Sequence, residues 1–186
     1  GGIPLIQRAA RAAAAAELVD LVVVSTDDDE IAELSIAAGA RVIRRPAEIS
    51  GDTASSESAV LHVLDALEDA GELVDVVVFI QATSPFIPSD RIDVAVDGVR
   101  SGRYDSMFSA YETYGFLWRR ADSGGGAGSG SGGDGDGDAA AEAINHDAAH
   151  RPRRQDREPH YLETGAFYVF QAGGFRRARH RFFGRI

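Results

Sequence analysis

The hydrophobic and polar positions of this chain alternate between strand-like and helix-like spacing. Short runs rich in β-branched residues predict buried strands at 21–25, 41–44 and 76–80. Apolar residues at helical spacing follow each run, with Thr26 expected to cap the second helix and Gly39 to end it. The expected helices fall within 4–16, 27–38, 56–70, 89–99 and 175–181, and further strands at 106–110, 116–118 and 165–170.

This alternation is typical of the α/β class. We predict three layers, with a mostly parallel sheet covered by helices on both faces. Residues 1–186 are expected to form a single domain. One segment, 123–138, interrupts the pattern with nine glycines in sixteen residues, and it is predicted to be a flexible Gly/Ser/Asp insertion within that domain.

Composition narrows the function classes. Hydrophobic residues make up 44% of the chain, which excludes disorder throughout, and no apolar run is long enough to span a bilayer. The chain has no cysteine, so it has neither disulfides nor thiolate metal ligands. The net charge of −10 argues against nucleic-acid binding, although residues 151–186 carry nine arginines against three acids. We expect no membrane association and a cytoplasmic location.

The most informative polar residues follow the strand at 76–80. Gln81 ends the apolar run, and Thr83, Ser84 and Pro85 come directly after it. Open α/β sheets bind ligands beyond the carboxyl ends of their strands. A side-chain amide there can both donate and accept hydrogen bonds, which suits a sugar or the edge of a base. The alternative interpretation is an ordinary turn ended by a proline.

Two other segments carry groups that bind anions. Residues 44–56 join a strand to a helix through Arg45 and a hydroxyl-rich helix start, and residues 151–156 hold three arginines. A capped helix and a basic linker are the plainer interpretations. The acids at 27–29 are better explained by the helix dipole than by a metal. The five histidines lack zinc-site spacing, and the common hydrolase, NTPase and dinucleotide motifs are absent.

Taken in order, several motifs resemble one family. They are VVVSTDDDEIAELSIAAGARVIRRPAEISGDTASS, VVFIQATSPF, YDSMFS, RPRRQD and ETGAFYVF. The chain is similar to the CMP-sialic acid synthetases (acylneuraminate cytidylyltransferases) from about Pro4 to Phe183, apart from the glycine-rich segment. The fold that this resemblance implies is that of the nucleotide-diphospho-sugar transferases.

The resemblance implies that CMP is transferred from CTP to a sialic acid or a related nine-carbon ulosonic acid, with release of pyrophosphate. In that family the anomeric hydroxyl attacks the α-phosphorus, and Mg²⁺ offsets phosphate charge. By the same resemblance, Arg45 and Ser56 contact the cytosine end of CTP, and Gln81 binds the sugar. The other implied roles are Arg154 at the sugar carboxylate, Tyr168 in the acyl pocket, and Phe182 and Phe183 at the partner subunit of a homodimer.

The sequence departs from the family pattern at three places. The glycine-rich triphosphate loop RGGSKxIPxKN and the metal-binding DIDxxxD segment are not found, and Thr164 stands where asparagine is usual. We therefore expect a chain trimmed at both ends that is inactive alone, with no metal ligand among its residues and no catalytic residue assigned. Two alternatives stay open: the same chemistry on legionaminate or pseudaminate, and a noncatalytic sugar-binding or oligomerising paralogue.

Overall fold

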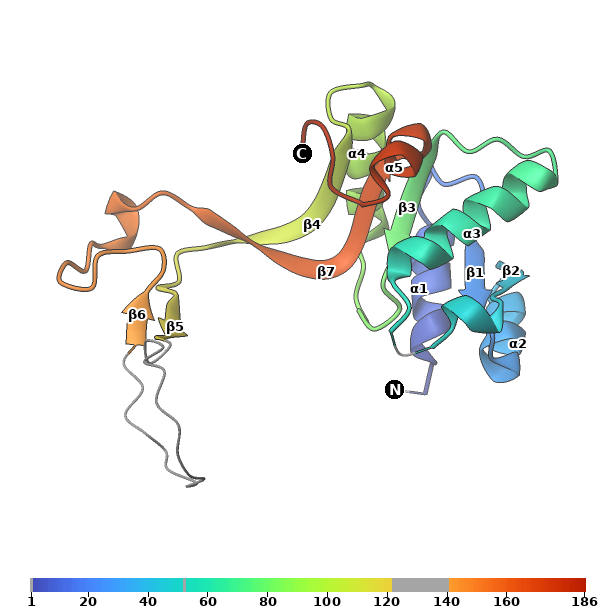
Figure 1. Cartoon of the computed structure of the whole chain (residues 1–186), viewed down its shortest axis with the longest axis horizontal. Coiled ribbons are helices and arrows are strands. Elements are labelled where there is room, and N and C mark those ends of the chain that lie inside the picture. The colour runs from blue at the N-terminus through green and yellow to red at the C-terminus, as the bar shows by residue number, and fades with distance from the viewer. Residues whose placement is uncertain (1, 52, 122–140) are drawn as a thin grey trace, which may run out of the picture. The chain divides into compact units, whose positions relative to one another are not determined.

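The computed structural model describes residues 2–51, 53–121 and 141–186 (Figure 1). The predicted flexible insertion at 123–138 lies outside the described residues. The helices are α1 (Leu5–Ala14), α2 (Asp29–Ala37), α3 (Ser56–Asp69), α4 (Ser89–Arg100) and α5 (Ala172–Ala178), with short 3₁₀ turns at Ala47–Ile49 and Arg154–Asp156. The strands are β1 (Val23–Thr26), β2 (Arg41–Arg44), β3 (Val76–Ile80), β4 (Ser106–Thr113), β5 (Trp118–Arg120), β6 (Ala141–Ala143) and β7 (His160–Gln171).

The chain divides into two compact units, and each is described by itself. The first unit comprises Gly1–Ala110 and Glu163–Ile186, and the second comprises Tyr111–Leu162. Whether residues 1–186 form the single domain that the sequence predicts is not tested by this division, so that expectation stays a prediction. None of the described helices is long and apolar enough to cross a membrane.

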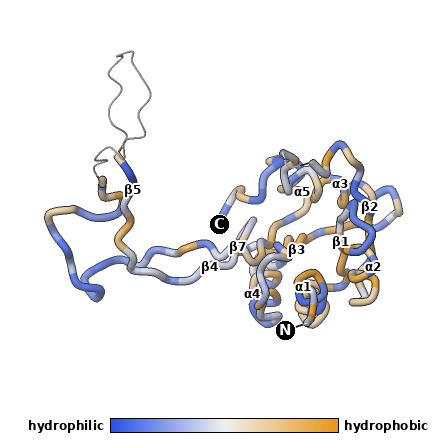
Figure 2. Tube along the Cα trace, turned by 90° about the horizontal axis from the view of Figure 1, so that it is seen from below, coloured by the Kyte–Doolittle hydropathy of each residue, from blue (hydrophilic) through white to orange (hydrophobic). Residues whose placement is uncertain are grey.

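The first unit is an α/β fold with helices on both faces of a sheet, as predicted. Alternation along β7 builds the two faces: Phe167 and Val169 point into one core, and Tyr168 and Phe170 into the other. The first core is closed by α4, and the second by α3 and α5 (Figure 1). Strand β3 is hydrophobic along its length (Figure 2), and its half-buried side chains alternate between the two cores.

Strand pairing departs from the parallel pattern at β7. Strands β1 and β2 pair in parallel, as expected from the helix that connects them. Strand β7, however, lies between β3 and β4 and runs antiparallel to β3, with Ile80 opposite Phe167. The chain reaches β7 from β4 through the second unit, without a crossover helix in the first unit. The alternation rule that predicts parallel neighbours therefore does not apply to this strand.

Two helix starts differ from the sequence prediction. Asp28, not Thr26, caps α2: its carboxylate accepts the Ile31 N–H at 2.8 Å. The Thr26 hydroxyl instead accepts the Asp28 N–H at 3.1 Å and is buried. The last helix spans Ala172–Ala178 and so begins and ends three residues before the expected 175–181. The Thr26 hydroxyl thus serves a local turn ahead of α2. The C-cap of the last helix is Arg179, whose φ of 52° lies in the left-handed region.

Phe170 is the side chain on which the second core depends most. It is fully buried and stacks on Phe175 with ring centroids 4.7 Å apart. We expect Phe170→Ala to lower the free energy of unfolding by about 3–5 kcal/mol, because the cavity cannot collapse fully. Urea denaturation measures this. Phe86→Ala, at a ring that is 82% exposed, is the matched control and should change it little; equal losses would contradict the assignment of the core.

Candidate functional site

Gln81 directly follows β3, and its side chain lies beside Gly165 of β7. Its N–H donates to the Ala166 carbonyl at 3.1 Å, which continues the ladder one residue beyond the strand. Gly165 has a φ of +70°, and a Cβ there would lie 2.9 Å from the Gln81 Oε1 atom. Glycine is therefore favoured at position 165 for two reasons: the positive φ strains other residues, and a Cβ would crowd the Gln81 amide. The side chain of Gln81 is held against β7 at the carboxyl end of β3.

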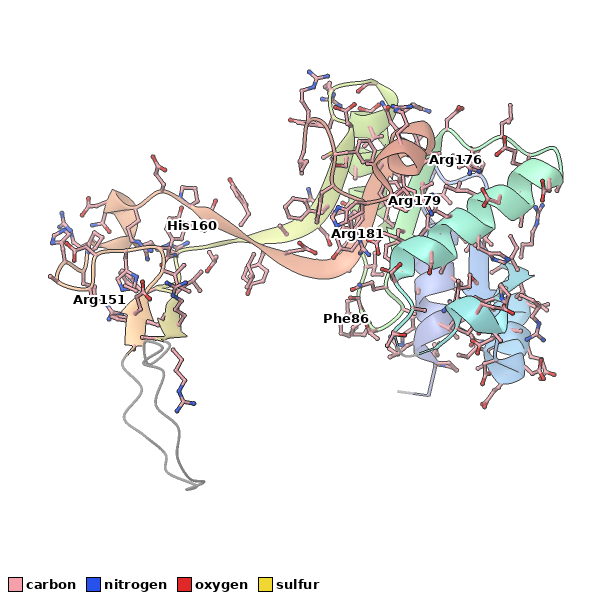
Figure 3. All side chains as sticks on the ribbon, in the orientation of Figure 1. Phe86, Arg151, His160, Arg176, Arg179 and Arg181 are labelled. Atoms are coloured by element: carbon pink, nitrogen blue, oxygen red, sulfur yellow. The ribbon has the colours of Figure 1, made fainter. Side chains whose placement is uncertain are left out.

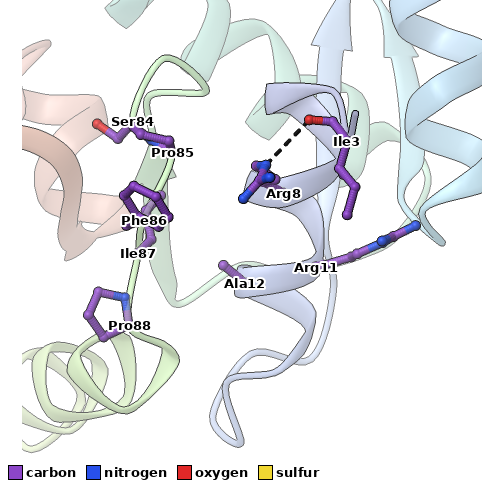
Figure 4. Close-up of a pocket in the computed structure, with 9 residues that line it drawn as sticks. All are labelled: Ile3, Arg8, Arg11, Ala12, Ser84, Pro85, Phe86, Ile87 and Pro88. Atoms are coloured by element: carbon purple, nitrogen blue, oxygen red, sulfur yellow. Dashed lines mark hydrogen bonds between the residues drawn. The ribbon is translucent and has the colours of Figure 1, made fainter. Parts of the chain in front are cut away.

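A pocket of about 450 Å³ opens beside the same turn (Figure 4). It lies between α1 and the loop 84–88, which starts where the Ser84 N–H donates to the Gln81 carbonyl at 3.1 Å. Arg8, whose Nε donates to the Ile3 carbonyl at 3.3 Å, faces the loop, whereas the head of Arg11 points away from it. The pocket has the volume of a small-molecule site. Its lining includes arginine and no acidic residue, so it suits a ligand that carries an anionic group.

Arg45 directly follows β2, at the carboxyl ends of the paired strands β1 and β2. Its N–H donates to the Thr26 carbonyl at 3.0 Å, so it extends the β1–β2 pairing beyond Arg44. Its guanidinium turns back onto Ser25, with NH2 2.5 Å from the carbonyl oxygen and Nε 3.2 Å from Oγ. These bonds fix the direction of the guanidinium at the carboxyl edge of β1 and β2.

Ser56 enters a network that the sequence analysis did not anticipate. Ser55 caps α3 by accepting the Ser58 N–H at 3.1 Å, which leaves Ser56 as the first helical residue. Arg181 donates from NH2 to the Ser56 hydroxyl oxygen, and Ser56 Oγ lies 3.2 Å from Glu57 Oε2. Arg181 also pairs with Glu57 Oε1, at 2.9 Å from Nε and 2.8 Å from NH2. Figure 3 shows Arg181 beside the start of α3.

The same guanidinium lies over two aromatic rings. Its central carbon is 4.5 Å from the centroid of Tyr168 and 4.8 Å from that of Phe79. Tyr168 is buried, and its hydroxyl donates to Glu163. Burial, and then this hydrogen bond, raise the pKa of the Tyr168 phenol, which therefore stays protonated as a donor. Arg181 thus joins the predicted nucleotide residue Ser56 to the predicted sugar residue Tyr168.

Phe182 and Phe183 pack within their own chain. The Phe182 ring meets Phe108 and Tyr168 edge-on, with centroids 5.5 and 5.8 Å away. Phe183 lies so close to Gly174 that a Cβ there would overlap its ring. Both rings belong to the second core. Their contact with a partner subunit stays a prediction.

Arg154 belongs to the second unit. It begins a 3₁₀ turn, and its guanidinium lies 4.6 Å from the centroid of Tyr114. Arg151 and Arg157 both lie over Phe116 in the same unit, at 4.5 and 3.9 Å. These contacts place Arg154 only within its own unit, so its role at the sugar carboxylate stays a prediction.

The structure therefore brings together three of the predicted residues. Ser56 and Tyr168 meet at Arg181, and the Phe182 ring contacts Tyr168. Gln81 instead contacts β7, and Arg45 contacts β1. The sequence analysis missed Arg181, Glu57 and Glu163. Arg181 and Glu57 pair across 124 residues, and Glu163 meets Tyr168 within the same strand, β7. The only sequence signal was an arginine directly before the phenylalanine pair. Within the described ranges, no group of three His, Asp or Glu side chains could hold a metal ion.

The comparisons with known proteins agree on the family. The chain belongs to the cytidylyltransferase family, whose model matches residues 1–172. It is 36% identical over 167 residues to N-acylneuraminate cytidylyltransferase A of Danio rerio, covering 90% of this chain and 35% of the relative. The corresponding enzyme of Oncorhynchus mykiss is 34% identical over 172 residues, covering 91% of this chain and 35% of that protein. This chain thus spans about a third of the length of these curated relatives.

Two further comparisons concern a bacterial relative and a solved structure. Pseudaminic acid cytidylyltransferase of Campylobacter jejuni is 30% identical over 112 residues, which is 60% of this chain and 48% of the relative. Among solved structures, CMP:2-keto-3-deoxy-manno-octonic acid synthetase complexed with CTP matches with a TM-score of 0.61. That match covers 94% of this chain and 66% of the other at 15% identity, and it confirms the predicted nucleotidyltransferase fold.

The Glu57–Arg181 pair should make stability depend on pH. Burial alone would raise the pKa of Glu57, but the hydrogen bond and charge of Arg181 outweigh it, so the pKa lies below its usual value of 4.5. The pair therefore contributes stability above the unfolded-state pKa, and this contribution is lost as the pH falls through the lower folded-state pKa. Urea midpoints of wild type and Glu57→Gln should differ at pH 7 and converge toward pH 3. A constant difference would refute the linkage.

Proposed function

We propose that the full-length protein transfers CMP from CTP to an N-acylneuraminate or a related nine-carbon ulosonic acid. The observation that carries this proposal is the 36% identity, over 90% of the chain, to a protein named N-acylneuraminate cytidylyltransferase. The geometry supports it: Gln81 and Arg45 directly follow the carboxyl ends of β3 and β2, where α/β folds bind nucleotides and sugars, and the Ser56 network lies at the start of α3. Pseudaminate is the second candidate acceptor, on the lower identity over 60% of the chain.

The reaction needs positioning and charge stabilisation more than covalent chemistry by the protein. The anomeric hydroxyl oxygen bonds to the α-phosphorus, the bond from that phosphorus to the bridging oxygen breaks, and pyrophosphate leaves. In this proposal Arg45 and Ser56 hold the cytosine end, Gln81 and Tyr168 hold the sugar, and Arg154 pairs with its carboxylate. We assign none of the described residues as the base that accepts the proton of the attacking hydroxyl.

Magnesium, a homodimer and a cytoplasmic location belong to the same proposal. Mg²⁺ would neutralise phosphate charge in the full-length enzyme. The residues described do not fit such a site, because they gather no group of three metal-binding side chains, and we derive no step through the ion. The homodimer rests on the resemblance of the Phe182–Phe183 pair to one that reaches a partner subunit. Analytical ultracentrifugation of the full-length protein tests it.

The assay that tests the function is formation of CMP-sugar and pyrophosphate by the full-length protein. CTP is supplied with N-acetylneuraminate, and in parallel with pseudaminate. We expect turnover with the first acid and a lower kcat/KM with the second. Binding of both substrates without turnover would favour a noncatalytic paralogue instead.

Gln81→Ala should weaken use of the sugar more than use of CTP. Removing the amide deletes its hydrogen bonds to the acceptor, so we expect the KM for the sugar to rise about tenfold while the KM for CTP changes little. Gln7→Ala is the matched control, because its amide donates to the Leu34 carbonyl, between α1 and α2. Unchanged sugar kinetics in Gln81→Ala would remove this residue from the site.

Arg154→Lys should also impair use of the acidic sugar. Lysine keeps the charge but replaces a planar two-donor fork with a point charge, so we expect at least a tenfold rise in the KM for the sugar. Arg153→Lys is the control, since that neighbour is exposed and pairs with Asp156 at 3.0 Å. Wild-type kinetics in Arg154→Lys would exclude a bidentate carboxylate contact.

A further inference from the structure

Arg181 is largely shielded from solvent, and it bonds to Glu57 and Ser56 at the start of α3. Its side chain is 12% exposed, and that of Glu57 is 18% exposed. The carboxylate pairs with Nε and NH2, the Ser56 hydroxyl takes a bond from NH2, and the rings of Phe79 and Tyr168 line its faces. An arginine held by a fork and by two rings has little freedom left, so its donors point in fixed directions.

This network fixes the direction of the Ser56 hydroxyl. A guanidinium can only donate, so the bond from Arg181 uses a lone pair of Ser56 Oγ. An ionised carboxylate can only accept, so the contact of 3.2 Å between Ser56 Oγ and Glu57 Oε2 uses the hydroxyl proton. A hydroxyl has one proton and two lone pairs. One lone pair therefore remains for a ligand, and Ser56 can accept a hydrogen bond from it but cannot donate one.

We propose that Arg181 is a positioning residue that, with Glu57, holds the Ser56 hydroxyl as an acceptor and so selects cytosine over uracil at this site. Cytosine presents an exocyclic amino group, which donates, where uracil presents a carbonyl oxygen, which only accepts. An acceptor at that point can bond the amino group but leaves the carbonyl oxygen without a partner. The inference rests on the proposed function, in which Ser56 meets the base of CTP.

A purely structural role is the competing interpretation, and the chain supplies a matched control for it. Arg176 also joins the carboxyl-terminal segment to α3, through ion pairs with Asp65 and with Glu68 at 2.9 Å. Its side chain is 34% exposed, and none of its contacts involves Ser56 or Tyr168. Loss of Arg176 therefore loosens the same two elements without freeing the Ser56 hydroxyl.

The experiment compares Arg181→Met, Arg181→Lys, Glu57→Gln and Arg176→Met in the full-length protein. Two quantities are measured for each variant: the free energy of unfolding in urea, and the ratio of CTP to UTP affinity by calorimetry. The same ratio is then taken from kcat/KM. In Glu57→Gln the amide oxygen stays toward Arg181 and the amide NH2 faces Ser56, so the hydroxyl proton is free to be donated to uracil. In Arg181→Met the Glu57 carboxylate loses the two bonds that hold it beside Ser56, so it no longer fixes the hydroxyl proton. We expect the preference for CTP to fall about tenfold in both variants. Arg176→Met should keep the wild-type ratio.

Arg181→Lys separates positioning from stability. A lysine can still pair with Glu57, so the free energy of unfolding should recover toward wild type. It cannot reproduce the fork, so the CTP preference should recover only in part. A CTP preference that stays at the wild-type level in Arg181→Met, or that falls equally in Arg176→Met, overturns the inference. If the wild-type protein transfers CMP when either of these results is found, only the inference about Arg181 fails and the proposed function stands. If the wild-type protein neither binds CTP nor transfers CMP, the proposed function and the inference both fail.

Discussion

The register of β7 against β3 is the constraint on which the rest of the first unit depends. Ile80 lies opposite Phe167 and Val76 opposite Gln171, and the side chains of both strands alternate between the two cores. A slip of one residue would turn every side chain of β7 to the other face. The same register brings Gly165 beside Gln81 and turns Tyr168 toward Arg181. Core packing and site geometry are therefore specified by one set of strand contacts.

Buried strands were the easiest elements to predict. The ranges 41–44 and 76–80 match β2 and β3 residue for residue, because both runs are short, contain β-branched residues and lie between glycine and proline turn signals. Strand β7 was predicted only over 165–170, whereas it spans His160–Gln171. Its first residues are exposed and mix polar with apolar side chains, so their conformation comes from strand pairing and not from a hydrophobic pattern of their own.

The candidate site was only partly visible in the sequence, for a different physical reason. Gln81 could be predicted because it ends a buried strand, and Ser56 because hydroxyl residues gather at helix starts. Arg181 could not, since its partner Glu57 is 124 residues away and nothing local distinguishes it from the other arginines of the basic tail. Contacts between distant residues depend on the tertiary fold, which periodicity does not describe.

A buried ion pair is a costly way to join two elements, and this bears on why Arg181 and Glu57 are paired under aromatic rings. Desolvation offsets most of the attraction between such charges, so well-packed apolar residues often hold a core equally well. The Arg176 pairs connect the same elements at the surface, where little desolvation is needed. What the buried pair adds is direction: its two charges dictate which way the Ser56 hydroxyl points, and apolar side chains could not do that.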